Sequence, residues 1–302
     1  MEDVFCDVAI RALTDPSSLI LLSATHNDAD IITQPRRDRQ HLPSASLPSW
    51  VPDWRGHPRH IFGTPQTPHL ACGNTKPSLS IHTSSLTLCI RGIHVDTIAI
   101  KSWTLHGKAF RIMHHDKLPP SPVESLWRRI IHGNLPINLS TPYVHNAHSS
   151  FFALVQTLTN ACIGMDRVRS YESIPEEEWL AHAAAYLNRT KQPKSRIDDD
   201  LLELGRSGGG DAFKWSHEAT LVTRYRCFAV TAQGYYVLGP DTIEQGDVVA
   251  ILNGGRTPFL LRRRGEDDSD GWMLVGECYV HGLMNGEALQ VNGALEDAFV
   301  IH

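Results

Sequence analysis

The spacing of apolar and polar positions predicts a short helix at the start of the chain and a β-hairpin near residue 100. Apolar residues between Glu2 and Leu13 recur at helical spacing, and Pro16 ends the pattern. From Ser78 to Ile100, apolar and polar residues alternate as they do along strands with one buried face. Gly92 permits a bend or bulge, so this segment predicts two paired strands.

Three further helices have recognisable start signals. The run that begins at Ser121 has a cap residue, a proline at the first helical position and a glutamate three residues after the cap. It predicts a helix to about His132. A second helix is expected over residues 149–163, where an apolar stripe precedes Gly164 as a left-handed stop. A third is expected over residues 175–189, because three glutamates occupy its first turn.

Two polar stretches separate these elements from the rest of the chain. Residues 191–210 are charged and then contain three consecutive glycines, which the interior of a helix or strand does not tolerate. We expect a flexible connection there, between a helical and mixed region (residues 1–205) and a C-terminal β module (residues 206–302). The polar segment Thr25–Ser46 is typical of a mobile surface loop, and the sequence leaves open whether it acts as a lid.

Strands dominate the last third of the chain. The runs VVAIL and TPFLL, joined by NGG, predict a hairpin with a glycine-dependent turn, and WMLVGECYV adds a further strand. Several short strands within about 70 residues favour a small curled sheet or half-open barrel. The predicted fold class is therefore α+β, with a helical part packed on a small C-terminal antiparallel β-barrel-like module. The N-terminal half supplies an additional β-hairpin.

Composition narrows the expected partners and location. The 302 residues are 41% hydrophobic and 20% charged, and the net charge of −5 is spread without long blocks. The one basic run, residues 262–264, is followed directly by acidic residues, so no nucleic-acid partner is expected. The start of the chain lacks a secretory signal, and no apolar run reaches the roughly 20 residues that span a bilayer. We expect a cytoplasmic protein without stable membrane insertion.

No cofactor and no metal site are predicted. The six cysteines are widely spaced without a C-x-x-C pair, so reduced, mostly buried thiols are expected. His57 with His60, and His114 with His115, lack the accompanying carboxylates or thiolates of metal sites. The nucleotide-binding and serine-hydrolase motifs G-x-G-x-x-G, G-x-x-x-x-G-K-[ST] and G-x-S-x-G do not occur in suitable context.

Two blocks resemble the C-terminal region of fungal heterokaryon-incompatibility (HET) proteins. The first is LPSWVPDW at residues 47–54, and the second is the series TAQGYYVLGP, GDVVAILNGGRTPFLLR and LVGECYVHGLMNGE within residues 231–287. The resemblance runs, with gaps, from the first helix to about Leu289. HET proteins mediate fungal self/non-self recognition, and their death-inducing output is attributed to an N-terminal domain that resembles TIR domains. We expect that effector domain to be absent here, so the resemblance does not imply its activity.

The tryptophan-bearing block contains the first candidate site residues. Asp53 lies between Pro52 and Trp54, and a carboxylate beside an indole can be a desolvated acid or base with a raised pKa. The alternative is that Asp53 caps a turn or pairs with Arg55. Trp50 and Trp54 are candidate ligand-binding residues, because two indoles offer a large apolar area.

The second block contains the remaining candidates. Glu277, Tyr279 and His281 alternate, so on a strand they share one face. Glu277 could orient His281, which would then move a proton or donate a hydrogen bond to a bound molecule, with Tyr279 lining the same face. The alternative is a polar network that braces the sheet. Arg262 could hold an anionic group of a ligand bidentately, or lie on an edge strand in solvent.

Two classes of function fit these residues. The first is a stand-alone HET-like scaffold recruited to fungal specialised metabolism, which binds an apolar terpenoid or polyketide intermediate between helices and β module. His281, Glu277 and Asp53 could then catalyse a cofactor-independent cyclisation, cycloaddition or isomerisation. The second is a non-enzymatic interaction or regulatory module in heterokaryon incompatibility, whose partner is a HET-family protein. The sequence leaves open whether the protein is an enzyme, which substrate it takes and its oligomeric state.

Overall fold

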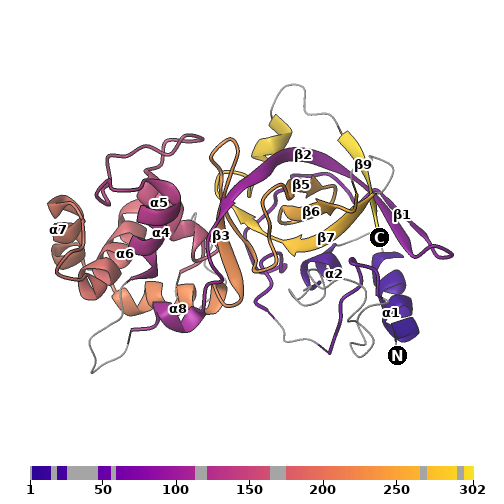
Figure 1. Cartoon of the computed structure of the whole chain (residues 1–302), viewed down its shortest axis with the longest axis horizontal. Coiled ribbons are helices and arrows are strands. Elements are labelled where there is room, and N and C mark those ends of the chain that lie inside the picture. The colour runs from indigo at the N-terminus through magenta and orange to yellow at the C-terminus, as the bar shows by residue number, and fades with distance from the viewer. Residues whose placement is uncertain are drawn as a thin grey trace. The chain divides into compact units, whose positions relative to one another are not determined.

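The chain forms two compact units, whose elements are drawn in Figure 1. The computed structural model describes residues 2–14, 19–25, 47–55, 59–112, 121–163, 175–265, 271–290 and 296–302. The β unit comprises Met1–Thr64, His69–Ala99 and Gly239–His302, and the helical unit comprises Pro65–Pro68 and Ile100–Leu238. The units interleave along the chain, whereas the sequence predicts one boundary between residues 205 and 206. That boundary, as a division between domains, stays a prediction.

The β unit combines two helices with most of the strands of the described chain. Its elements are α1 (Glu2–Thr14), α2 (Ile20–Ser23), β1 (Leu79–His82), most of β2 (Thr87–Lys101), β5 (Val248–Leu252), β6 (Phe259–Arg263), β7 (Trp272–Glu277), β8 (Tyr279–Val280), the 3-10 turn η7 (Glu287–Gln290) and β9 (Glu296–Ile301). The predicted N-terminal helix and the two predicted hairpins, β1 with β2 and β5 with β6, are confirmed.

Five strands of the β unit close into a ring. Going round, β5 pairs with β6, β6 with β7, β7 with β9, β9 with β2 and β2 with β5. The pairs are antiparallel except for β7 and β9, which meet in a parallel bridge between Trp272 and Ile301. The predicted α+β class with a barrel-like module is therefore confirmed. The predicted hairpin of the N-terminal half is also confirmed, and its strand β2 is in addition one of the five strands of the ring.

β2 reaches several partners because it bends. Along its length it pairs with β1 and β9 and then with β5, and its register with β5 shifts between His94 and Asp96. At Gly92 a side chain would lie 2.5 Å from the carbonyl oxygen of Ile251, so only glycine allows the two strands to approach at this point. The sequence placed a bend or bulge at this glycine.

Helix α1 is anchored to the core of the β unit. Cys6, Ala9 and Leu13 are buried on one side of α1, in a cluster that includes the ring residues Leu252 and Phe259. The residues share one side of the helix because they recur at intervals of three and four. The opposite side of α1 is consequently left facing outward.

The helical unit holds the remaining helices. Its elements are the 3-10 turn η3 (Gly107–Phe110), α4 (Pro122–Leu126), the π-helical turn η4 (Trp127–Ile131), α5 (Ser150–Thr157), α6 (Glu176–Thr190), α7 (Asp199–Ser207), α8 (Ala212–Val222), β3 (Arg226–Thr231) and most of β4 (Tyr236–Pro240). The predicted helix starts near residues 121, 149 and 175 are confirmed. The hydroxyl of Ser121 accepts a hydrogen bond from the amide of Val123, and that of Ser149 accepts one from Phe152.

Trp215 of α8 occupies the centre of the core of the helical unit. It is fully buried, its ring centroid lies 4.5 Å from that of Tyr186 on α6 and 6.1 Å from that of Phe110, and its indole nitrogen donates to the carbonyl of Val155 on α5 at 3.4 Å. One side chain thus contacts three elements of the unit.

Two expectations about the helical unit are wrong. The flexible connection predicted over residues 191–210 contains α7, whose Leu201 is buried. Its glycines serve close packing, because a side chain at Gly205 or Gly210 would lie 2.5 or 2.0 Å from a carbonyl oxygen of α6. The second predicted helix ends at Thr157 rather than near residue 163. Its predicted stop, Gly164, lies outside the described residues, as do Pro16, His57, His114, His115 and the loop after Thr25.

Candidate functional site

The carboxylate of Glu277 binds backbone amides of another segment of the β unit. Glu277 is 1% exposed, and its carboxylate accepts hydrogen bonds from the amides of Phe62 at 2.6 Å and Gly63 at 3.0 Å. The hydroxyl of Thr257 donates to the same carboxylate at 3.5 Å. A buried carboxylate needs such donors because its charge is costly to desolvate. These contacts fit the alternative of a bracing network.

Tyr279 and His281, which follow Glu277 by two and four residues, are in contact. The Tyr279 hydroxyl is 3.2 Å from Nδ1 of His281, and both side chains are 2% exposed. The ring of His69 packs edge-on against Tyr279, with centroids 5.8 Å apart. Two imidazoles and a phenol therefore gather in the interior of the β unit. The structure brings Tyr279 and His281 together as the alternation predicts, whereas a catalytic role for Glu277 and His281 stays a prediction.

Asp53 forms a two-pronged ion pair with Arg55. The distances are 2.7 Å from Nε to Oδ1 and 2.8 Å from Nη2 to Oδ2, and the amide of Arg55 also donates to Oδ1. The hydrogen bonds from Arg55 lower the pKa of Asp53, although partial burial opposes them. A raised pKa, which the catalytic interpretation requires, is therefore not found. The geometry matches the alternative pairing with Arg55.

The two tryptophans of the first block have different surroundings. Trp50 is fully buried in the core of the β unit, and its indole nitrogen donates to the carbonyl of Leu86 at 3.1 Å. Trp54 is 47% exposed and packs edge-on against Phe5 of α1, with ring centroids 5.1 Å apart. Only Trp54 is accessible from outside without rearrangement of the core, and ligand binding by either indole stays a prediction.

Arg262 lies on β6, one of the five strands of the ring, and its guanidinium has several partners within the protein. Its guanidinium donates to both carboxylate oxygens of Asp247, at 2.7 and 2.9 Å, and to the carbonyl of Thr242 at 2.7 Å. Glu244 adds an ion pair at 3.2 Å. The expected edge strand in solvent is wrong, because β6 has a partner on each side. The bidentate partner of this arginine is the protein's own carboxylate.

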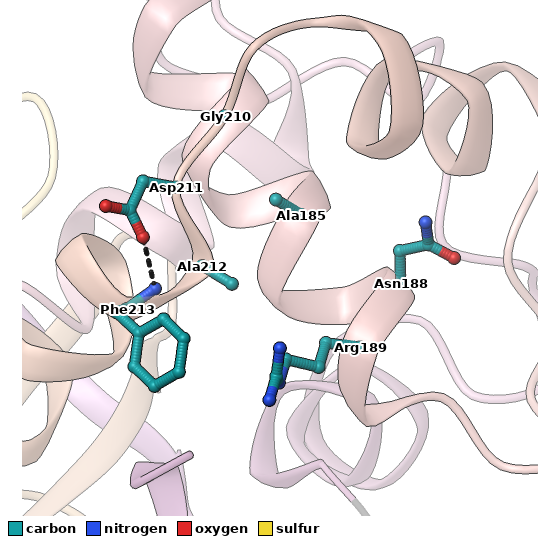
Figure 2. A pocket seen from close by; sticks show the side chains of 7 residues that line it. All are labelled: Ala185, Asn188, Arg189, Gly210, Asp211, Ala212 and Phe213. Carbon is teal, nitrogen blue, oxygen red and sulfur yellow. Dashed lines mark hydrogen bonds between the residues drawn. The ribbon is translucent and has the colours of Figure 1, made fainter. Parts of the chain in front are cut away.

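A groove that the sequence did not suggest lies between α6 and the start of α8. It has a volume of about 380 Å³ and is lined by Ala185, Asn188, Arg189, Gly210, Asp211, Ala212 and Phe213. Figure 2 shows the methyl groups of Ala185 and Ala212 facing into this space and the guanidinium of Arg189 beside the ring of Phe213. The guanidinium carbon lies 5.0 Å from that ring's centroid, a cation–π geometry. We call it the α6–α8 groove.

Asp211 and His182 support one wall of the α6–α8 groove. The carboxylate of Asp211 caps α8 by accepting from the amides of Phe213 at 2.8 Å and Lys214 at 3.4 Å. The amide of Asp211 donates to Nδ1 of His182 at 2.7 Å, which requires a neutral imidazole. Burial lowers the pKa of His182, with help from Lys214 and against Glu178 and Asp211. The sequence signal that could have indicated the start of α8 is Asp211, because aspartate is favoured as the residue that caps a helix.

The described residues offer little for metal binding or membrane crossing. No cluster of three or more histidine, cysteine, aspartate or glutamate side chains able to hold a metal ion occurs among them. Among the helices of the described segments, none has the length and apolar character needed to traverse a lipid bilayer. The six cysteines are free thiols.

Comparison with known proteins gives two matches. The family model of the Het-6 beta-barrel domain matches residues 148–301. Heterokaryon incompatibility protein 6, OR allele, of Neurospora crassa is 23% identical over 295 residues, an alignment that covers 84% of this chain. The chain spans about 40% of that relative's length. No solved structure matches. The resemblance to HET proteins expected from the sequence is thus confirmed.

Proposed function

Because this chain belongs to the Het-6 beta-barrel domain family, we propose that it acts as an interaction module in heterokaryon incompatibility, with another HET-family protein as its partner. The observation that carries the proposal is the family match over residues 148–301. It is supported by the relative from Neurospora crassa, whose name states that process. We further propose a cytoplasmic location, where such partners would meet.

The contacts of three candidate site residues favour an interaction role over a catalytic one. Glu277 is bound to backbone amides, Asp53 to Arg55 and Arg262 to Asp247. Carboxylates used in this way stabilise loops and turns, and they offer reacting molecules little. Binding of a terpenoid or polyketide, with cofactor-free cyclisation, stays a prediction without an observation that favours it.

The test is a functional assay in Neurospora crassa. The chain is expressed in strains carrying the OR allele of the related protein, and growth and cell viability are measured in forced heterokaryons. We expect expression to change the incompatibility response, and a tagged chain to recover a HET-family protein from the same cells. An unchanged response together with no recovered HET-family protein would contradict the proposal.

Matched variants separate interaction from catalysis. Asp53→Asn and His281→Gln remove two of the three predicted catalytic groups with little change of shape, and both are expected to keep the effect if they fold. Gly210→Val places a side chain against the carbonyl of Ala181, within 2.0 Å of the first added atom, and should abolish the effect by disrupting the helical unit. Loss of the effect in folded His281→Gln or Asp53→Asn would instead favour a catalytic role.

A further inference from the structure

The α6–α8 groove combines an apolar floor with the basic side chain of Arg189 among its lining residues. The floor consists of the methyl groups of Ala185 and Ala212, and the ring of Phe213 is 38% exposed beside it. Arg189 and Lys214 are exposed cations on the two helices that form the groove. The carboxylate of Asp211 is turned to the amides at the start of α8, so its charge is used there. The groove therefore favours an apolar segment that carries negative charge.

The outward side of α1 has the complementary character. Val4 and Val8 are 59% and 47% exposed, and they lie one helical turn apart on the same side. Asp3 and Asp7 precede them in the chain and are also exposed, and the exposed Arg11 follows one turn after Asp7. We call Asp3, Val4, Asp7 and Val8 the acidic α1 face. This face cannot turn inward, because the opposite side of α1 is already buried in the core of the β unit.

We propose that two copies of the chain associate head to tail, with the acidic α1 face of one copy in the α6–α8 groove of the next. Val4 and Val8 would cover the alanine floor, and Asp7 would face Arg189. The two surfaces are different parts of the molecule, so the contact is heterologous, and it produces a ring if its rotation closes and an open filament if it does not. This inference goes beyond the proposed function, because it concerns identical copies.

Sedimentation velocity of the purified chain over a range of concentrations tests the contact. We expect self-association that weakens as salt rises, since opposite charges at a surface are screened. Arg189→Glu and Asp7→Arg each place like charges opposite one another and should each weaken association about 10-fold or more. Lys194→Glu is the control, because it makes the same charge change as Arg189→Glu on an exposed residue of the same unit outside the groove.

Mixing the two charge variants makes the test specific. In the mixture, Asp7 of the Arg189→Glu chain meets Arg189 of the Asp7→Arg chain, and the introduced Arg and Glu also meet. Association should return to near the wild-type level, although each variant alone is impaired. Circular dichroism confirms that both variants fold.

Three outcomes would overturn the inference: a monomer at every concentration, association insensitive to both charge reversals, or a mixture no better than its components. Binding of the groove to a small molecule instead would appear as a ligand-dependent rise in Tm that Arg189→Glu abolishes, without any change in mass. A monomer that still recovers HET-family proteins from cells would end this inference and leave the proposed function standing.

Discussion

The β unit and the helical unit treat their buried polar groups differently. In the β unit, acidic and basic side chains make several of the connections: Arg262 is bound to Asp247 and the Glu277 carboxylate to two backbone amides. In the helical unit, several connections are made by neutral groups, such as His182 of α6, whose Nδ1 accepts from the amide of Asp211, and Tyr236, whose pKa burial raises to about 12. The difference follows from architecture. Loops between strands expose backbone donors that a carboxylate can bind, whereas helices satisfy their own amides and approach through small residues.

This contrast implies different weaknesses in the two units. The helical unit is stabilised by close packing of side chains. Loss of a large side chain, or addition of a small one where there is no space, should therefore lower its stability. The β unit depends on pairs of charges, so removal of one partner should cost more than removal of both. Hydrogen exchange read by mass spectrometry reports on each unit separately and is therefore the common measurement for the predictions below.

The largest effect is expected for Trp215→Ala in the helical unit. The side chain is fully buried against Tyr186 and Phe110, and its removal should lower the free energy of unfolding by about 3–5 kcal/mol. Urea denaturation measures the loss, and faster hydrogen exchange should appear in α5, α6 and α8. The control is Trp54→Ala, since Trp54 is 47% exposed. Equal losses for the two variants would contradict the assigned core.

A smaller loss is expected for Asp247→Ala in the β unit. It leaves the guanidinium of Arg262 partly buried without its bidentate partner, which should cost about 2–3 kcal/mol, less than for a fully buried pair because that side chain is 16% exposed. The double variant Asp247→Leu with Arg262→Met should recover most of this loss. A double variant less stable than Asp247→Ala in urea denaturation would show that the charges are not the controlling feature.

Glu277→Gln should cost about 1–2 kcal/mol, because the amide keeps one acceptor oxygen and turns its NH2 group toward an amide donor. The amides of Phe62 and Gly63 should exchange faster than in the wild type, and the rest of the β unit should not change. Glu296→Gln is the control on an exposed carboxylate paired with Arg91. Unchanged exchange at Phe62 and Gly63 would argue against the bracing role.

The smallest effect on stability is expected when the pH is lowered. Burial lowers the pKa of His182 in the folded chain, so the unfolded chain binds more protons. The contribution of His182 to the free energy of unfolding is complete above its pKa in the unfolded chain, which is about 6.5. This contribution decreases as the pH falls from there to the pKa in the folded chain. We expect less than about 1 kcal/mol because Glu178 and Asp211 favour the protonated imidazole and oppose the effect of burial. Lys214, Glu178 and Asp211 face His182 and set the exact position of the transition.

The control for this prediction is His182→Gln, which can still accept from the amide of Asp211 but does not titrate. Its stability should vary less between pH 7 and pH 5, as measured by urea denaturation at each pH. Asp53 provides the contrast in the β unit: Arg55 lowers its pKa, so its contribution is present above about pH 4 and is lost only below that. Identical pH profiles for wild type and His182→Gln would refute the role of the imidazole.

Local features of the chain were readable from the sequence where a few neighbouring residues decide the conformation. The capping serines at 121 and 149 bind amides two or three residues on, and the NGG turn places a glycine with φ of 84° at Gly254. The contacts of the candidate site were not readable in this way. The partners of Glu277 lie 214 and 215 residues away in the chain, and alternation along one strand indicates a face without saying what covers it.

The sequence by itself determined the helix starts, the two hairpins and the α+β class, because these depend on periodicity and on turn residues within short windows. Only the tertiary structure decided that β2 from the N-terminal half pairs with β5 and β9, and that the glycines after residue 204 pack α7 and α8 against α6. It also decided that the Asp247 carboxylate meets Arg262. Such choices depend on which distant surfaces fit together, and their free energy is gained only when the whole unit assembles.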